Sequence, residues 1–181
     1  MTRLYFLDDA ERFAHQAWDA LKLEPPVEVE KVAKRLGIDL YREQFVEQID
    51  GLYLRMPDAP PVIAINSSYL KPPGRQRFTA AHEVGHHLLC RRAVSKTRLF
   101  YLDSVETRKN KLERMCDRFA ALLLMPEQIV KQWFEELSAN TENRVSIMSE
   151  RFGVSAWAMR VRLRELGLPY SKWQKRKLGD K

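Results

Sequence analysis

One stretch of this chain reads Arg77-Phe78-Thr79-Ala80-Ala81-His82-Glu83-Val84-Gly85-His86-His87-Leu88-Leu89-Cys90. Its apolar residues recur at helical spacing and no proline interrupts it, so it predicts a helix. Residues four apart share one helix face, so His82 and His86 can direct both imidazoles at one ion. Neutral imidazole suits Zn²⁺, with bonds of about 2.0–2.1 Å. The stretch therefore predicts a helix carrying two ligands of a metal site.

Three further residues of this helix have expected roles. Glu83 is placed to take a proton from a metal-bound water. Gly85 costs roughly 1 kcal/mol relative to Ala in a helix interior, so we expect another backbone element to approach closely there. His87 points about 100° away from His86, so we expect it to be structural or near the surface.

A catalytic zinc site needs a third protein ligand and one open position. The segment 111–126 carries an apolar stripe at helical spacing, with Glu113 and Asp117 four residues apart beside it. Glu113 can complete the ligand set, and Asp117 can accept the free N–H of a ligand histidine. Glu106, Asp103 and Cys116 remain alternative third ligands.

The order of predicted elements indicates an α+β fold. Two helices come first, then three grouped strands, and then a long helical part, which differs from regular alternation of strand and helix. Apolar periodicity and Pro or Gly breaks define the segments. The predicted helices cover 9–23, 27–36, 74–90, 108–124, 126–137, 141–152 and 155–166, and the strands cover 38–45, 51–56 and 61–66.

Composition fits an ordinary globular protein. The chain has 181 residues, of which 45% are hydrophobic and 30% charged, and no apolar run is long enough to span a membrane. No secretory signal is visible at its start. Cys90 and Cys116 are the only cysteines, which we expect to be reduced and buried in a cytoplasmic protein.

The net charge is +7, and the last 22 residues hold eight basic against two acidic side chains. A basic end attracts nucleic acid or acidic partners, but a solvated tail is the more common explanation.

The segment Val145–Met159 has the pattern of a helix-turn-helix, with Gly153 in the turn. Arg160, Arg162 and Arg164 follow on the second helix and can in principle contact DNA. Arg162, however, stands where such motifs usually bury an apolar residue. We therefore favour a helical pair that docks on the rest of the chain or on a protein partner.

Two segments, Arg75–Leu89 and Glu113–Pro126, form motifs that are specific in combination. Together with Pro25-Pro26-Val27, Pro61–Asn66 and Phe152–Ser155, they closely resemble the ImmA/IrrE family of bacterial and phage metallopeptidases, over about residues 10–168. The family often has Ala-Asn where this chain has Cys116-Asp117. Asp117 still matches the Asp of the wider gluzincin pattern.

The resemblance implies a zinc site with His82, His86 and Glu113 as ligands, Glu83 as catalytic base and Asp117 orienting a ligand. It implies a mainly helical zincin-type domain over 1–138, packed with a small three-stranded antiparallel or mixed sheet. A helix-turn-helix-like segment over 139–168 and a basic tail over 169–181 follow.

The implied activity is zinc-dependent endoproteolysis, selective for a helix-turn-helix repressor in a stress-response or mobile-element switch. The alternative is a DNA-binding or protein-binding regulator whose metal site is structural or degenerate.

Hydrolysis of a peptide bond also needs a donor for the developing oxyanion and a place for the substrate. Tyr101, Arg77 and Tyr69 are possible donors. The strand Val62, Ile63, Ala64, Ile65 and Asn66 directly precedes the site helix. If it is an edge strand, an extended substrate can add to it by backbone hydrogen bonds, whereas a central position would remove this possibility.

Overall fold

The computed structural model describes residues 7–46, 48–68, 70–90, 99–104, 111–137 and 143–170, with the backbone alone at 7, 8 and 99–104. Three sequence predictions lie outside this part of the chain: Tyr69 as a donor, Glu106 as a ligand, and the basic tail beyond residue 170. Among the described helices, none combines the length and apolar character needed to cross a bilayer.

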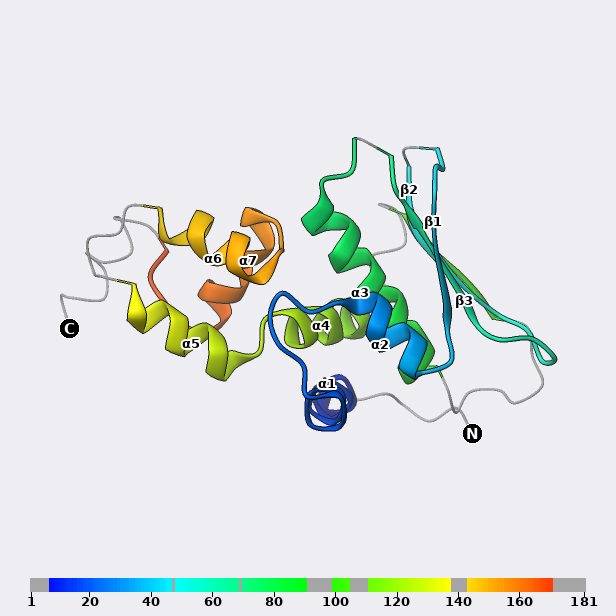
Figure 1. Cartoon of the computed structure of the whole chain (residues 1–181), viewed down its shortest axis with the longest axis horizontal. Coiled ribbons are helices and arrows are strands. Elements are labelled where there is room, and N and C mark those ends of the chain that lie inside the picture. Colours follow the sequence, from blue (N-terminus) through cyan, green and yellow to red (C-terminus); the bar gives the residue numbers. More distant parts are fainter. Residues whose placement is uncertain are drawn as a thin grey trace.

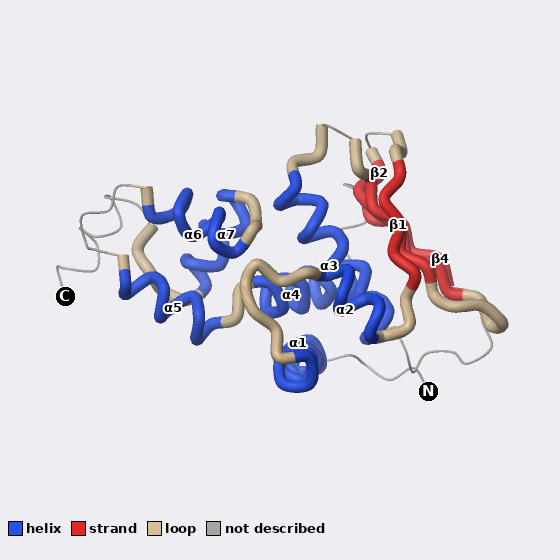
Figure 2. Tube along the Cα trace, viewed as in Figure 1, coloured by secondary structure: helices blue, strands red, loops and turns tan. Residues whose placement is uncertain are grey.

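The order of elements is two helices, a small sheet and a helical remainder, so the predicted α+β class is confirmed (Figure 2). A strand at Leu99–Ser104 was not predicted. In the sequence it follows the helix Pro73–Leu89 and precedes the helix Lys111–Leu124. The helices are α1 (Leu7–Leu21), α2 (Val29–Arg35), α3 (Pro73–Leu89), α4 (Lys111–Leu124), α5 (Glu127–Glu136), α6 (Arg144–Phe152) and α7 (Ala156–Glu165), and the strands are β1 (Asp39–Glu43), β2 (Ile49–Arg55), β3 (Val62–Asn66) and β4 (Leu99–Ser104).

The sheet is mixed and has the strand order β1-β3-β2-β4. β1 pairs with β3 in parallel, while β2 is antiparallel to both β3 and β4. β3, the strand from Val62 to Asn66, is therefore interior, with both of its edges paired. An extended substrate cannot add to it, so the prediction of this strand as a substrate edge is wrong, and the edge strands are β1 and β4.

Helix α3 is the centre of the fold because it contacts both the sheet and α4 (Figure 1). Val84 and Ala81 of α3 are fully buried together with Ile63 and Ile65 of β3 and Phe119 of α4. Helix α1 packs on α4. The site helix is thus covered by the sheet and by a second helix, and His82, Glu83 and His86 lie in the interior.

The C-terminal helical pair, α6 and α7, is attached to the rest of the molecule by close backbone contacts. Gly74 of α3 lies so near the turn before α7 that a Cβ there would come within 2.6 Å of the Val154 carbonyl carbon. Gly153 ends α6 in the left-handed region with φ of 62°, and Arg77 donates a hydrogen bond to its carbonyl. The pair docks on α3, in agreement with the favoured interpretation that this segment packs on the rest of the chain.

Candidate metal centre

The two histidines of α3 and one carboxylate of α4 converge on a single point. The Nε2 atoms of His82 and His86 are 3.1 Å apart, and Glu113 Oε2 lies 3.0 Å from the first and 3.4 Å from the second. Ligands bound tetrahedrally at about 2.0–2.1 Å lie roughly 3.3 Å from one another. The three atoms therefore have the spacing of ligands that share one ion.

Asp117 fixes the protonation state of His82. Its Oδ1 lies 2.9 Å from His82 Nδ1, so the carboxylate accepts the N–H of that nitrogen. The neutral ring then presents a lone pair at Nε2, toward the His86 nitrogen and the Glu113 oxygen. Three acceptor atoms that meet in a buried space repel one another unless a proton or a cation lies between them, so the donor set fits a metal ion.

The electrostatics of Glu113 agree with this arrangement. Burial alone would raise the pKa of the Glu113 carboxyl, but the nearby imidazoles of His82 and His86 outweigh it and lower the pKa to about 2. Glu113 is almost fully buried, and so are both histidines. A charged acceptor is thus held in a dry site next to two imidazoles.

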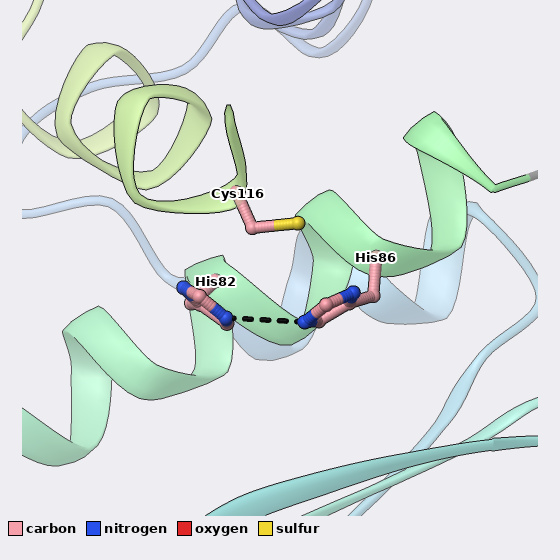
Figure 3. A group of neighbouring side chains, drawn as sticks. All are labelled: His82, His86 and Cys116. Atoms are coloured by element: carbon pink, nitrogen blue, oxygen red, sulfur yellow. Dashed lines mark hydrogen bonds between the residues drawn. The ribbon is translucent and has the colours of Figure 1, made fainter. Parts of the chain in front are cut away.

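Cys116 is a second candidate for the third ligand position. Ligand atoms of His82, His86 and Cys116 all lie within 4.8 Å of one another, and Figure 3 shows the thiol above the helix that carries both imidazoles. The Glu113 oxygen is closer to both Nε2 atoms, and burial raises the pKa of the Cys116 thiol well above its usual range. We therefore favour Glu113 on geometry.

The backbone of α4 approaches α3 at Gly85, as the sequence predicted. A Cβ on Gly85 would lie 3.2 Å from Cys116 Cα and 3.2 Å from a ring carbon of Phe119. This contact brings Glu113 and Asp117, which flank Cys116 on α4, within reach of the histidines. The absence of a Cβ at position 85 thus allows the distances at the metal site.

Glu83 lies between α3 and the sheet, with no solvent exposure. Its neighbour is Gly51 of β2, where a Cβ would come within 3.0 Å of Glu83 Oε1 and 2.6 Å of Thr79 Cγ2. Gly51 therefore leaves the space that the carboxylate occupies. The sequence pattern placed Gly51 at the start of a predicted strand, and this role was missed; an isolated Gly in a strand pattern is the signal that could have found it.

The expected oxyanion donors are placed as follows. The Arg77 guanidinium is bound to the Gly153 carbonyl, in the contact that fixes the C-terminal pair. Tyr101 lies on the edge strand β4, where the backbone alone is described, and Asp103 lies on the same strand.

His87 is buried on the sheet side of α3, and its Nδ1 lies 3.1 Å from the Tyr53 hydroxyl. Burial raises the pKa of that tyrosine to about 12. Both observations agree with the structural role expected for His87.

Comparison with known proteins gives consistent matches. Residues 33–164 match the family model Peptidase_M78, described as the IrrE N-terminal-like domain. A stretch of 95 residues is 34% identical to the radiation response metalloprotease IrrE of Deinococcus radiodurans, covering 52% of this chain and 28% of that protein. This chain thus matches less than a third of that relative's length.

A solved structure also resembles the fold. A Mycobacterium tuberculosis transcriptional regulator superposes with a TM-score of 0.57 at 16% identity, over 86% of this chain and 46% of that one. At this identity the likeness concerns the fold alone.

Proposed function

Because this chain belongs to the Peptidase_M78 family of metallopeptidases with an IrrE N-terminal-like domain, we propose that it is a zinc-dependent endopeptidase. In this proposal His82, His86 and Glu113 hold the zinc ion, Glu83 is the catalytic base and Asp117 orients His82. The observation that carries it is the convergence of three acceptor atoms within 3.0–3.4 Å of one another in a buried site.

Zinc suits this donor set, since two imidazoles and one carboxylate are the ligands of a known class of catalytic zinc site. When bound, the ion supplies Lewis-acid polarisation of the scissile carbonyl. Asp117 keeps the His82 ring in one tautomer and one orientation through the hydrogen bond at Nδ1. The protein thus holds its ligands in place before substrate arrives.

Glu83 acts as the general base and then as the general acid. Its carboxylate is buried beside Gly51, one residue after His82 and three before His86, so it adjoins the metal face of α3. It takes a proton from the attacking water and delivers the proton to the leaving amine. Of the three expected oxyanion donors, Arg77 is held by Gly153, so we assign this role to Tyr101 or Tyr69.

The edge strand β4 is the better candidate for binding extended substrate, now that β3 is interior. β4 pairs with β2, and Asp103 is opposite Gly51, the residue next to Glu83. A chain added along the outer edge of β4 would form backbone hydrogen bonds one strand away from the catalytic carboxylate.

We propose that the substrate is a helix-turn-helix repressor and that cleavage relieves repression in a stress response or a mobile element. The resemblance to the ImmA/IrrE family and the printed name of the Deinococcus relative, a radiation response metalloprotease, support this proposal. The two free cysteines are buried, which fits a cytoplasmic protein.

The experiment is cleavage of a candidate repressor, chosen among helix-turn-helix proteins encoded beside this gene. The zinc-loaded wild type and Glu83→Gln are incubated with it, and intact mass spectrometry follows the products. We expect one or two defined cleavages by the wild type and a loss of about 10²–10⁴-fold in the variant, with zinc content unchanged. Equal cleavage by both proteins would show that Glu83 is not the base.

A regulator that binds DNA through α7 is the second candidate function. Arg160 and Arg164 are exposed on α7, as a reading helix requires, but Arg162 is 1% exposed and its Nε donates to the Met125 carbonyl. Electrophoretic shift with genomic fragments at physiological salt separates the two functions. A shift lost in Arg160→Ala, without any zinc-dependent cleavage, would favour the regulator.

A further inference from the structure

A cavity of about 650 Å³ opens between α7 and the helices that carry the metal ligands. Figure 1 shows α7 opposite the N-terminal part of α3, with the end of α4 below. The volume lies within the roughly 300–1,000 Å³ typical of ligand sites. We call this cavity the α7 groove. Its wall contains residues of α3, α4 and α7, so it exists only because the C-terminal pair is docked.

The lining of the α7 groove is apolar with a basic component. Phe78, Ala121, Met125, Trp157 and Val161 supply the apolar surface. Trp157 is 71% exposed, which is unusual for a tryptophan in a described helix of this protein. An exposed aromatic side chain that lines a concave surface is typical of residues that dominate binding to a protein partner.

Four guanidinium groups and two carboxylates line the same groove, and because Asp50 binds Arg75 and Glu11 binds Arg118 from outside it, Arg114 is the lining arginine without an ion pair to any described residue. The arginines are Arg75, Arg114, Arg118 and Arg162, and the carboxylates are Asp117 and Glu165. Both carboxylates are engaged: Asp117 with His82, and Glu165 with Arg118 and Arg162. The charge of Arg114 favours an anionic group on the occupant.

Two of these arginines have donors to offer. Arg162 is 1% exposed, and its Nη2 has no hydrogen-bond partner among the residues that the structure describes. Arg114 is exposed and likewise has no ion pair with any described residue. A carboxylate that enters the groove would satisfy a buried donor whose lack of a partner costs free energy.

The α7 groove adjoins the metal centre through two of its lining residues. Thr79, in the groove wall, is one helical turn before His82, and Asp117 both lines the groove and accepts the N–H of His82. A polypeptide segment bound in the groove would therefore lie within one helical turn of His82.

We propose that the α7 groove binds a segment of the protein substrate that carries an acidic side chain between apolar ones. The proposal rests on the proposed function in so far as the occupant is a substrate of the metal centre. In this proposal the C-terminal helical pair, α6 and α7, selects the substrate by forming one wall of the groove. A duplex is a poorer occupant, because Trp157 and Val161 of α7 face the cavity that the catalytic part closes on its other side.

The test measures binding without hydrolysis, on full-length, zinc-loaded Glu83→Gln protein labelled with 5-fluorotryptophan. The chain has four tryptophans, and Trp157→Phe identifies the ¹⁹F signal of Trp157. The probes are two synthetic peptides, acetyl-GSLLEALLEASG-amide and its counterpart with Gln in place of both Glu. We expect the acidic peptide to shift the Trp157 signal to saturation, and the Gln peptide to bind at least about tenfold more weakly.

Two charge reversals provide a matched pair. Arg114→Glu changes an exposed arginine in the groove wall, and Arg160→Glu changes an exposed arginine of α7 outside it. We expect at least a tenfold loss of affinity for the acidic peptide in the first and less than about a twofold change in the second. Equal losses, equal binding of both peptides, or no shift of the Trp157 signal would each overturn the proposal. So would a Trp157 shift caused by a 20-base-pair duplex that displaces the acidic peptide.

The outcome is separable from that of the proposed function, because Glu83→Gln binds without turnover. If the groove selects the acidic peptide but the wild type cleaves no substrate, the groove proposal is supported and the peptidase proposal is contradicted. If the wild type cleaves a substrate but neither peptide binds in the groove, the peptidase proposal is supported and the groove proposal is contradicted.

Discussion

The metal centre and the α7 groove lie along the same pair of helices but are built in opposite ways. At the centre, His82, His86 and Glu113 are almost fully buried, and each has a polar partner. In the groove, the largest side chain, Trp157, is mostly exposed and Arg162 has an unused donor among the described residues. The chain supplies all three proposed metal ligands, whereas the groove presents apolar surface and an arginine donor. Substitutions at the metal centre should therefore change zinc affinity and hydrolysis, and substitutions in the groove should change substrate binding.

The largest expected effect comes from Glu113→Ala, which removes one of three proposed ligands. We expect zinc affinity, measured by competition with a chelator, to fall by more than the 10–100-fold typical of residues that only orient a ligand. The ¹⁹F signal of Trp157 should keep its position, because the groove does not include Glu113. Cys116→Ala is the control and should retain zinc. If instead Cys116→Ala loses the metal and Glu113→Ala keeps it, the thiol is the third ligand.

Gly51→Ala should come next, because its Cβ would lie 2.6 Å from Thr79 Cγ2 and 3.0 Å from Glu83 Oε1. We expect hydrolysis to fall at least about tenfold and the free energy of unfolding to drop by about 1–3 kcal/mol. Zinc content should be unchanged, since no proposed ligand touches Gly51. Adding Thr79→Ser removes the clashing methyl group and should restore part of the stability. A fully active Gly51→Ala protein would show that Glu83 does not need its present position.

Asp50→Asn tests the connection between the regions, since Arg75 lines the groove and also binds Asp50. Burial would raise the pKa of Asp50, but Arg75 and Lys71 outweigh it and hold that pKa below its usual value. The ionised form therefore stabilises the fold above about pH 4, and this stabilisation is lost as pH falls through the lowered pKa. Urea unfolding should show the variant less stable by about 1–3 kcal/mol at pH 7, converging with the wild type in strong acid. A constant difference at every pH would exclude the ion pair as its cause.

The smallest effect on the protein itself is expected for Trp157→Ala. Its side chain is mostly exposed, so the free energy of unfolding should change by no more than about 0.5 kcal/mol, and zinc affinity should stay the same. Hydrolysis of a protein substrate should show a higher KM at similar kcat. An unchanged KM would place Trp157 outside substrate recognition.

The same contrast explains what could be predicted from the sequence. The spacing of His82 and His86 is local, because a helix alone sets which residues share a face, and the apolar stripe beside Glu113 identified its partner helix. The α+β fold class was predictable because the predicted strands are grouped in the sequence. β4 was missed, and β3 was wrongly considered as an edge, because strand order depends on pairings that no local pattern encodes.

The α7 groove and the role of Gly51 also could not be derived from spacing. The groove requires the docking of Gly74 against Val154 and of Arg77 against Gly153, contacts between residues more than 70 positions apart. Arg162 was a candidate for DNA contact, although its place in the motif usually holds a buried residue, and the structure buries it against Met125. Burial of a long side chain is decided by tertiary packing, which a helical pattern does not specify.

The bulge in β2 has a consequence for how the molecule can change in evolution. The register of β2 against β4 shifts between Ile49 and Gly51, so that Ile49 faces Ser104 and Gly51 faces Asp103. Because of this irregularity, Gly51 is the residue that lies against Glu83. Its neighbour Asp50 binds Lys71 and Arg75. A single inserted or deleted residue in either strand would move every following side chain to the other face. Natural relatives should therefore vary in length at the loop between β2 and β3, where residues 57–60 are exposed, and keep the lengths of β2 and β4.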